Sequence, residues 1–261
     1  MSLLEFCESR TISTCLGKIS VTEISRDEPR VIILLHGAFL DKYLWSDFLP
    51  AMAGYRIFIV DMPNHGSSRE ADSDWNIEDC GRMLINIIEH FRLSKVTAVG
   101  HSLGALAVLH AAVLRPDLFK KAGFADMPLD KAGRFERGLA AMNRLLCLSP
   151  ERLAMRTAKK LFQPQSLRNN DELYVKFARP FNILNRSERN NTFRNVYYPE
   201  KSSYRLLMSL KIPSSAVRGR YDFVPAADCI PTTVVEGGHM SPLEDPGGFT
   251  AWLKEDIIQP L

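Results

Sequence analysis

The sequence feature that most constrains the fold is a Gly-His-Ser-Leu-Gly pentapeptide at residues 100–104. A β-rich run precedes it, and an apolar segment that predicts a buried helix follows it. A serine at the tip of a sharp turn between a strand and a helix needs neighbours without bulk two positions away on either side. Gly100 and Gly104 meet this need, so the pattern predicts a strained turn that presents Ser102. An ordinary turn is the simpler interpretation of five such residues, and the rest of the chain must decide.

Strand-like and helix-like segments alternate along most of the chain. Continuous apolar runs such as 31–35 are typical of strands that are buried on both faces. The predicted strands lie at 11–15, 19–24, 31–35, 55–60, 95–99, 121–126, 214–218 and 232–236. The first two make a hairpin plausible, with Gly17 and Lys18 between them. The alternation predicts an α/β fold with a mostly parallel, doubly wound sheet.

The alternation stops between residues 130 and 205, where helix-like stretches occur without a convincing buried strand. We predict a helical cap at 130–205, inserted after the sixth strand of a core formed by 1–129 and 206–261. An independent domain is less favoured, because no linker-like tract borders the segment. Residues 131–205 carry 16 Lys or Arg and 6 Asp or Glu, which leaves a balance of −7 on the rest of a chain with net charge +3. A basic cap could attract an anionic ligand, although solvated helix faces explain the charge more simply.

Composition and terminal features set the expected environment. The chain is 46% hydrophobic and 24% charged, which is ordinary for a globular protein in water. No apolar run has membrane-spanning length, and the N-terminal segment lacks the features of a secretory signal. Five scattered cysteines without a C-x-x-C pair indicate free thiols in a reducing compartment. We therefore expect a cytoplasmic protein that contacts neither membrane nor nucleic acid, and that needs neither a metal nor another cofactor because no ligand cluster is spaced for one.

His239 is the best-placed base for Ser102. It follows two glycines directly after the last predicted strand, where ligand-handling residues collect in open α/β sheets. For the other histidines a structural role is the default. These competitors are His36, His65, His90, His101 and His110.

Two aspartates compete to orient the imidazole of His239. Asp222 and Asp126 each follow the end of a predicted strand. Asp222 is preferred because it completes the chain order Ser, Asp, His, whereas Asp126 could cap the first helix of the cap. Asp61 follows a strand as well, but we interpret its segment, 61–68, as a structural network of turns.

Stabilising an oxyanion next to Ser102 requires two preorganised backbone amides, each worth about 3–4 kcal/mol of barrier. The amide of Leu103, directly after the serine, is one candidate. The second should come from the loop after 31–35, where Ala38 is the first choice and Phe39 the second. Phe39 is also a candidate for substrate contact.

These separated motifs together resemble the α/β-hydrolase superfamily over essentially the whole chain. The matching segments, in order, are His36-Gly37, 61–68, 100–104, Gly219-x-x-Asp222 and Gly238-His239. The resemblance implies a Ser102–His239–Asp222 triad, an oxyanion hole at Ala38 and Leu103, and a cap over the pocket. Among the branches of the superfamily, the chain is most similar to the small capped serine esterases.

The chain departs from the family pattern at two places. Asn64 stands where the family usually has a glycine, a change that is tolerable because Asn can adopt a positive φ. Asp222 and His239 are only 17 positions apart, so the segment between them has room for about one helical turn instead of a full helix. We still expect the acid and the base to meet.

The sequence therefore predicts a serine hydrolase that cleaves a carboxylic ester through an acyl-enzyme on Ser102. Lactonases, thioesterases, carbon–carbon bond hydrolases and acyltransferases use the same triad, which cannot separate them. The expected partner is a small-molecule ester, and the basic cap favours an anionic or carrier-bound one. A ligand-sensing protein with the same fold is the alternative from another functional class.

Overall fold

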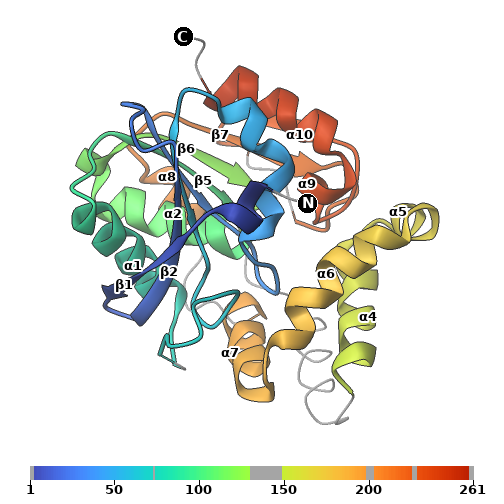
Figure 1. The fold of residues 1–261 in the computed structure, drawn as a ribbon. Coiled ribbons are helices and arrows are strands. Elements are labelled where there is room, and N and C mark those ends of the chain that lie inside the picture. The colour runs from blue at the N-terminus through green and yellow to red at the C-terminus, as the bar shows by residue number, and fades with distance from the viewer. Residues whose placement is uncertain (1–2, 73, 130–148, 198–202, 225–227, 259–261) are drawn as a thin grey trace.

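An eight-stranded sheet forms the centre of the protein in the computed structural model, which describes residues 3–72, 74–129, 149–197, 203–224 and 228–258 (Figure 1). The strand order is β1-β2-β4-β3-β5-β6-β7-β8. The strands are β1 (Ser9–Thr14), β2 (Gly17–Ile24), β3 (Val31–Leu35), β4 (Arg56–Val60), β5 (Val96–His101), β6 (Phe119–Ala125), β7 (Ser214–Gly219) and β8 (Thr232–Val235). β2 pairs antiparallel with β1 and β4, and all other pairs are parallel. The eight predicted strands and the mostly parallel sheet are confirmed.

The middle of the sheet is buried because its strands have neighbours on both sides and apolar side chains on both faces. Every residue of β5 is buried, and β5 pairs with β3 and β6. At the sheet's edge, the β1–β2 hairpin turns at Cys15 and Leu16, two residues before the predicted position. Gly17 opens β2 with a φ of 81°, a conformation that glycine adopts without strain.

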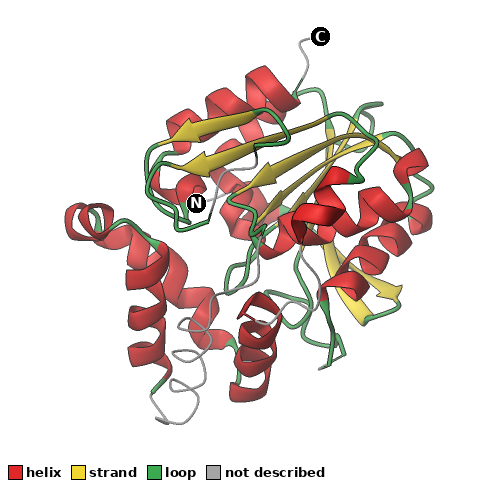
Figure 2. Ribbon diagram, turned by 180° about the vertical axis from the view of Figure 1, so that it is seen from behind, coloured by secondary structure: helices red, strands yellow, loops and turns green. Residues whose placement is uncertain are grey.

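Helices cover both faces of the sheet (Figure 2). In one group, α1 (Ile77–His90) packs on α2 (Leu103–Leu114), which packs on β5, β6 and α8 (Ser203–Met208). In the other, α10 (Pro246–Trp252) packs on the 3₁₀ helix η2 (Lys42–Met52) and on β8, while the π-helical η4 (Leu253–Ile257) packs on β6. The short elements are η1 (Leu3–Phe6), η3 (Pro116–Leu118) and α9 (Ser241–Glu244). Among the described helices, none is both long enough and apolar enough to cross a membrane.

Four helices between β6 and α8 form the described part of the cap, and they stand apart from the sheet in Figure 1. They are α4 (Pro150–Leu161), α5 (Pro164–Asn169), α6 (Asp171–Ile183) and α7 (Arg186–Tyr197). A helical cap after the sixth strand is therefore confirmed, and the first part of the predicted cap, 130–148, lies outside the described residues. Because α8 packs on α2, the chain has returned to the core by Ser203. We propose a division into a core of 1–129 and 206–261 and a cap of 130–205.

Candidate active site

The turn at residues 100–104 joins β5 to α2 and holds Ser102 in a strained conformation. Ser102 has φ 49° and ψ −111°, outside the regions that a serine adopts without cost. A Cβ on Gly100 would overlap the backbone of Gly104, and a Cβ on Gly104 would overlap the carbonyl oxygen of Leu35. The sequence predicted that the residues on both sides of the serine must be small. The structure gives the reason, because other backbone atoms lie directly against Gly100 and Gly104.

Ser102, His239 and Asp222 form one chain of hydrogen bonds. Ser102 Oγ lies 2.8 Å from Nε2 of His239, and Nδ1 of His239 lies 3.0 Å from Oδ1 of Asp222. All three residues are buried, although they come from loops after β5, β7 and β8. An ionised carboxylate only accepts hydrogen bonds, so Nδ1 carries the ring proton and Nε2 is free to accept the proton of Ser102.

The contact between His239 and Asp222 favours a positively charged imidazole next to a negatively charged carboxylate. Burial alone would lower the pKa of His239, but the charge and the hydrogen bond of Asp222 outweigh it and raise that pKa. Burial alone would raise the pKa of Asp222, but His239 and the amide of Val224 lower it. His239 is therefore poised to accept a proton and hold it next to a carboxylate.

Asp126, the competing acid, has other partners. Its Oδ1 accepts a hydrogen bond from the amide of Gly219 at 2.9 Å, and its Oδ2 accepts one from Ser241 Oγ at 2.8 Å. These bonds join the end of β6 to the loops that carry Asp222 and His239. The structure therefore brings Asp222, and not Asp126, into contact with Nδ1 of the histidine.

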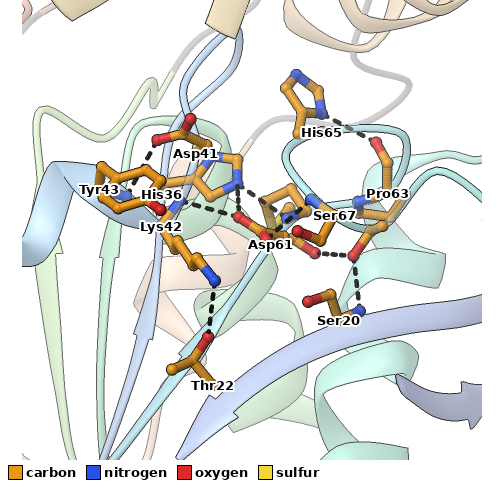
Figure 3. Close-up of polar contacts among 12 residues, drawn as sticks. Ser20, Thr22, His36, Asp41, Lys42, Tyr43, Asp61, Pro63, His65 and Ser67 are labelled. Carbon is orange, nitrogen blue, oxygen red and sulfur yellow. Dashed lines mark hydrogen bonds and ion pairs between the residues drawn. The ribbon is translucent and has the colours of Figure 1, made fainter. Parts of the chain in front are cut away.

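Two buried histidines connect the loop after β3, which holds His36, to the loop after β4, which holds His65; Figure 3 draws both rings. Nε2 of His36 accepts the amide of Met62 at 2.9 Å, and Nε2 of His65 accepts the amide of Phe39 at 3.1 Å. Each loop thus supplies an imidazole that fixes an amide of the other loop. The rings lie edge to face, with centroids 5.5 Å apart.

Both of these rings are neutral, which their acceptor role requires. Nδ1 of His36 donates to the carbonyl of Gly37, and Nδ1 of His65 donates to the carbonyl of Pro63. Burial lowers the pKa of His36 to about 4 and, with His36 nearby, that of His65 to about 3. Sequence reasoning assigned these histidines a structural role by default, and the contacts agree with that role.

The hydrogen bonds of these two histidines decide which backbone amides are free to bind an oxyanion. The amide of Phe39 is taken by His65, so the second choice for the oxyanion donor is not available. The amide of Ala38 has no protein partner among the described residues, and that of Leu103 begins α2, where helix geometry leaves it without an acceptor in the helix. Ala38 and Leu103 remain the predicted pair.

Asp61 organises the neighbouring turns, as Figure 3 shows. Its carboxylate accepts the amides of Lys42 at 2.9 Å and Ser67 at 3.0 Å. In the same segment Asn64 has a φ of 65° and accepts the indole N–H of Trp75 at 2.8 Å. The segment is thus a hydrogen-bonded turn network, and asparagine adopts the positive φ expected of it.

Two phenylalanines directly follow candidate site residues in the chain, Phe39 after Ala38 and Phe223 after Asp222. Phe39 is buried and packs on Phe181 of α6 and Phe193 of α7, with ring centroids 4.9 and 4.6 Å apart. Its predicted contact with substrate stays a prediction. Sequence reasoning missed Phe223, which is about half exposed and lies with its ring centroid 4.9 Å from that of His239. Its place directly after the acid was the available signal.

No described group of three or more His, Cys, Asp or Glu side chains is arranged to hold a metal ion. The groups that the described residues bring together at the site are the serine, the imidazole and backbone amides. That set suits attack on a carbonyl carbon, with a base for the nucleophile and donors for the oxygen that becomes charged.

Comparison with known proteins places these features in a family. Residues 30–137 match the family described as alpha/beta hydrolase fold. The (E)-2-((N-methylformamido)methylene)succinate hydrolase of Acinetobacter baylyi is 30% identical over 95 residues, and the karrikin insensitive 2 receptor CA of Petunia hybrida is 29% identical over 97. These matches cover 36% and 35% of this chain. The chain spans only 36% of the length of each of these relatives.

Solved structures match over nearly the whole chain. A hydrolase from Pseudomonas aeruginosa PA01 has a TM-score of 0.83 at 17% identity, with 94% of this chain and 96% of that chain covered. The enol-lactonase from Burkholderia xenovorans LB400 has a TM-score of 0.82 at 13% identity, with 94% and 98% covered. At such identity the likeness concerns the fold, which agrees with the family match and with the order of motifs along the chain. Residues 30–137 therefore match the α/β-hydrolase family, and the chain as a whole has the α/β-hydrolase fold.

Proposed function

We propose that this protein is a serine hydrolase that cleaves a carboxylic ester through an acyl-enzyme on Ser102. Nε2 of His239 takes the hydroxyl proton as Oγ of Ser102 attacks the ester carbonyl carbon. The protonated imidazole then gives that proton to the departing alcohol oxygen, and the bond between this oxygen and the acyl carbon breaks. His239 then takes a proton from water as the water oxygen attacks the acyl carbon. The bond between this carbon and Oγ of Ser102 breaks, and the imidazolium returns the proton to Oγ, which releases the acid and free Ser102.

The observation that carries this proposal is the continuous hydrogen-bonded chain from Ser102 through His239 to Asp222, at 2.8 and 3.0 Å. Asp222 would hold the tautomer that accepts the serine proton and would stabilise the imidazolium that forms. The amides of Ala38 and Leu103 would receive the oxyanion, each contributing about 3–4 kcal/mol.

The substrate is proposed to be a small-molecule ester. The basic balance of residues 131–205 favours an anionic or carrier-bound one, and one relative is named for a succinate. Lactones, thioesters and carbon–carbon bonds next to a carbonyl are the alternative substrates for the same triad. A cytoplasmic location, suggested by the odd number and scatter of the cysteines, belongs to the same proposal.

A fluorophosphonate probe and a panel of p-nitrophenyl esters test the assignment. We expect the probe to label the wild type at Ser102 and to leave Ser102→Ala unlabelled, with ester turnover lost in the variant. Ser241→Ala is the matched control, because Ser241 is a buried serine that donates to Asp126 and does not reach the imidazole in this structure. Wild-type turnover in Ser102→Ala would exclude the mechanism.

The likeness to a protein named as a receptor supports one other candidate, a ligand-sensing protein that keeps the fold. The same probe separates the two functions. A sensing protein without an active nucleophile would resist labelling, whereas a hydrolase would react. Running esters, lactones and thioesters beside Ser102→Ala would then identify the bond that is cleaved.

A further inference from the structure

The backbone of His239 is held from two sides. On the core side, Nε2 of His101 donates to the carbonyl oxygen of His239 at 3.0 Å. On the cap side, the amide of His239 donates to the carbonyl oxygen of Leu161, the last residue of α4, at 2.7 Å. The cap therefore contacts the backbone of the residue that carries the proposed base.

Glu244 reinforces the contact on the cap side. Its carboxylate accepts the amide of Gly238, with Oε1 at 2.7 Å, and the amide of Gln163, with Oε2 at 3.0 Å. Gly238 directly precedes His239, and Gln163 lies in the cap between α4 and α5. One side chain thus fastens the histidine loop and the cap to each other through charge-assisted hydrogen bonds.

The two backbones approach too closely for a larger residue. A Cβ on Gly238 would lie 2.7 Å from the carbonyl oxygen of Leu161 and 2.9 Å from the amide nitrogen of Gln163. Burial raises the pKa of Glu244, and its bonds to the amides of Gly238 and Gln163 oppose that rise. The partly buried carboxylate compensates for its own desolvation by accepting two amides that no other described residue accepts.

We propose that Glu244 is a positioning residue: it couples the cap segment 161–163 to the loop of His239 and so sets the place of the imidazole next to Ser102. The inference rests on the proposed function. A hydrogen bond of 2.8 Å between Ser102 and His239 tolerates little displacement, and misplacement by 1 Å can cost about a hundredfold in rate. A cap that shifts relative to the core changes the rate of acylation through this coupling, in addition to any change in substrate access.

The chain offers a substitution that removes a single N–H from this coupling. Gln163 has a φ of −62°, which proline prefers, and the preceding Phe162 is extended at φ −90° and ψ 152°. Gln163→Pro therefore deletes the amide that Glu244 accepts without requiring a new backbone conformation, and its ring carbon Cδ also pushes the carboxylate away from this nitrogen. Gln163→Ala is its matched control, because it loses the same side chain and keeps the amide.

Glu244→Ala removes both hydrogen bonds of the carboxylate and leaves the backbone bond between His239 and Leu161, and Glu236→Ala controls for loss of a carboxylate in the same loop. Glu236 is exposed and pairs with Arg220. We expect kcat and the rate of fluorophosphonate labelling to fall about a hundredfold in Glu244→Ala and about tenfold in Gln163→Pro, with KM changed far less. Both controls should stay within about twofold of the wild type.

A spectroscopic readout keeps the inference testable without turnover. The Nδ1 proton of His239, bound to Asp222, gives a downfield proton resonance whose position reports the ring's placement. We expect this resonance to shift or broaden in Glu244→Ala and Gln163→Pro. If the wild type is not labelled by fluorophosphonate, the proposed function fails, and this resonance alone decides the role of Glu244.

A merely structural role for Glu244 would give a different result. Thermal unfolding would then occur at a lower temperature, while the labelling rate of folded protein and the Nδ1 resonance would match the wild type. That result in Gln163→Pro, which loses one hydrogen bond, would overturn the inference even if Glu244→Ala did not fold.

Discussion

The loops at the carboxyl ends of the core strands, here called the core edge, and the cap are held in place in different ways. At the core edge, the serine turn lies between strands that are buried and paired on both sides, and its glycines pack against backbone. In the described cap, α5 buries no side chain, and a cavity of about 900 Å³ lies between α6 and η2. The core edge is positioned by many cooperative contacts, whereas the cap depends on a few identifiable ones.

Besides the packing of Phe39 on Phe181 and Phe193, polar contacts join the cap to loops of the site. Arg69, in the turn network, pairs with Glu188 of α7 at 2.7 Å, and Asn195 of α7 donates to the carbonyl oxygen of Trp75 at 2.8 Å. Substitutions in the core should therefore act on stability or on chemistry directly. Substitutions in the cap should act through single attachments, each of which can be removed without unfolding the sheet.

The largest effect is expected at the core edge, from exchange of Asp222 for asparagine. Asp222→Asn offers His239 an amide in place of a carboxylate, which favours the wrong tautomer, and we expect kcat to fall about 10⁴-fold with little change in stability. Single-turnover kinetics with a p-nitrophenyl ester measures this loss.

Asp126→Asn is the matched control for that exchange. Asp126 is as buried as Asp222, but its partners are Gly219, Ser241 and His101, whose Nε2 lies 3.4 Å from Oδ2. The variant therefore leaves a donor unmatched and should cost about 1–3 kcal/mol of unfolding free energy. Its kcat should fall less than about tenfold. If Asp222→Asn and Asp126→Asn lost kcat equally, the loss would depend on removing any buried carboxylate near the ends of the strands, and not on contact with the imidazole.

The next effect is expected where the cap meets the turn network. Glu188→Gln removes the charge that Arg69 faces, in a pair whose side chains are 9% and 35% exposed. Because a partly buried guanidinium then lacks its counter-charge, we expect the free energy that opposes local opening of α7 to fall by about 2 kcal/mol. Amide hydrogen exchange should show the loss as faster exchange in α7 with β5 unchanged, and equal acceleration in both would contradict separate attachment of the cap.

The sequence was informative where local pattern and structure have the same cause. Apolar runs predicted the strands because both faces of the middle strands are buried, and the glycines predicted the turn at Ser102 because only glycine permits the backbone contact. For the helix through Ile77 and Ile88 the sequence indicates Ser73 or Asp74 as the N-cap, whereas in the structure Asn76 caps α1 and accepts the amide of Asp79. Ser73 lies outside the described residues.

Contacts between distant segments left no such pattern in the sequence. Nothing around Glu244 indicates that its carboxylate joins Gly238 to Gln163, which is 81 positions away. The pairing of His65 with Phe39 was equally invisible, since an imidazole that accepts an amide looks like any buried histidine. Such contacts depend on how the loops and the cap pack together, and a single sequence does not encode that in any local period.

A smaller effect, in the core again, concerns the pH dependence of stability. The folded pKa of His65 is lowered to about 3, below its value near 6.5 in the unfolded chain, so the unfolded state binds more protons between these values. Stability therefore falls as pH decreases through this range, by about 1.4 kcal/mol per pH unit for each such histidine.

His65→Gln isolates this contribution, because glutamine offers an acceptor near the position of Nε2 and does not titrate. Other buried groups, such as Asp61 with its raised pKa, contribute with the opposite sign, so only the difference between variant and wild type is informative. We expect urea unfolding to show a slope between pH 6 and pH 4 that is shallower by about 1 kcal/mol per unit in the variant. If the unfolding free energies of variant and wild type changed with pH at the same slope, His65 would be protonated in the folded protein over this range.

The smallest effect is expected where the cap and core approach across the cavity. Lys176 of α6 lies 3.4 Å from Asp47 of η2 and 3.7 Å from Glu172, and all three side chains are well exposed. Exposed pairs gain little because water already solvates both charges, so Lys176→Ala should change the unfolding free energy by less than about 0.5 kcal/mol. Salt at about 1 M should abolish even this difference, since screening then acts within a few ångströms. A loss as large as that of Glu188→Gln would show that the cap is held firmly at α6 as well, and the contrast between a cooperative core edge and a cap on single attachments would fail.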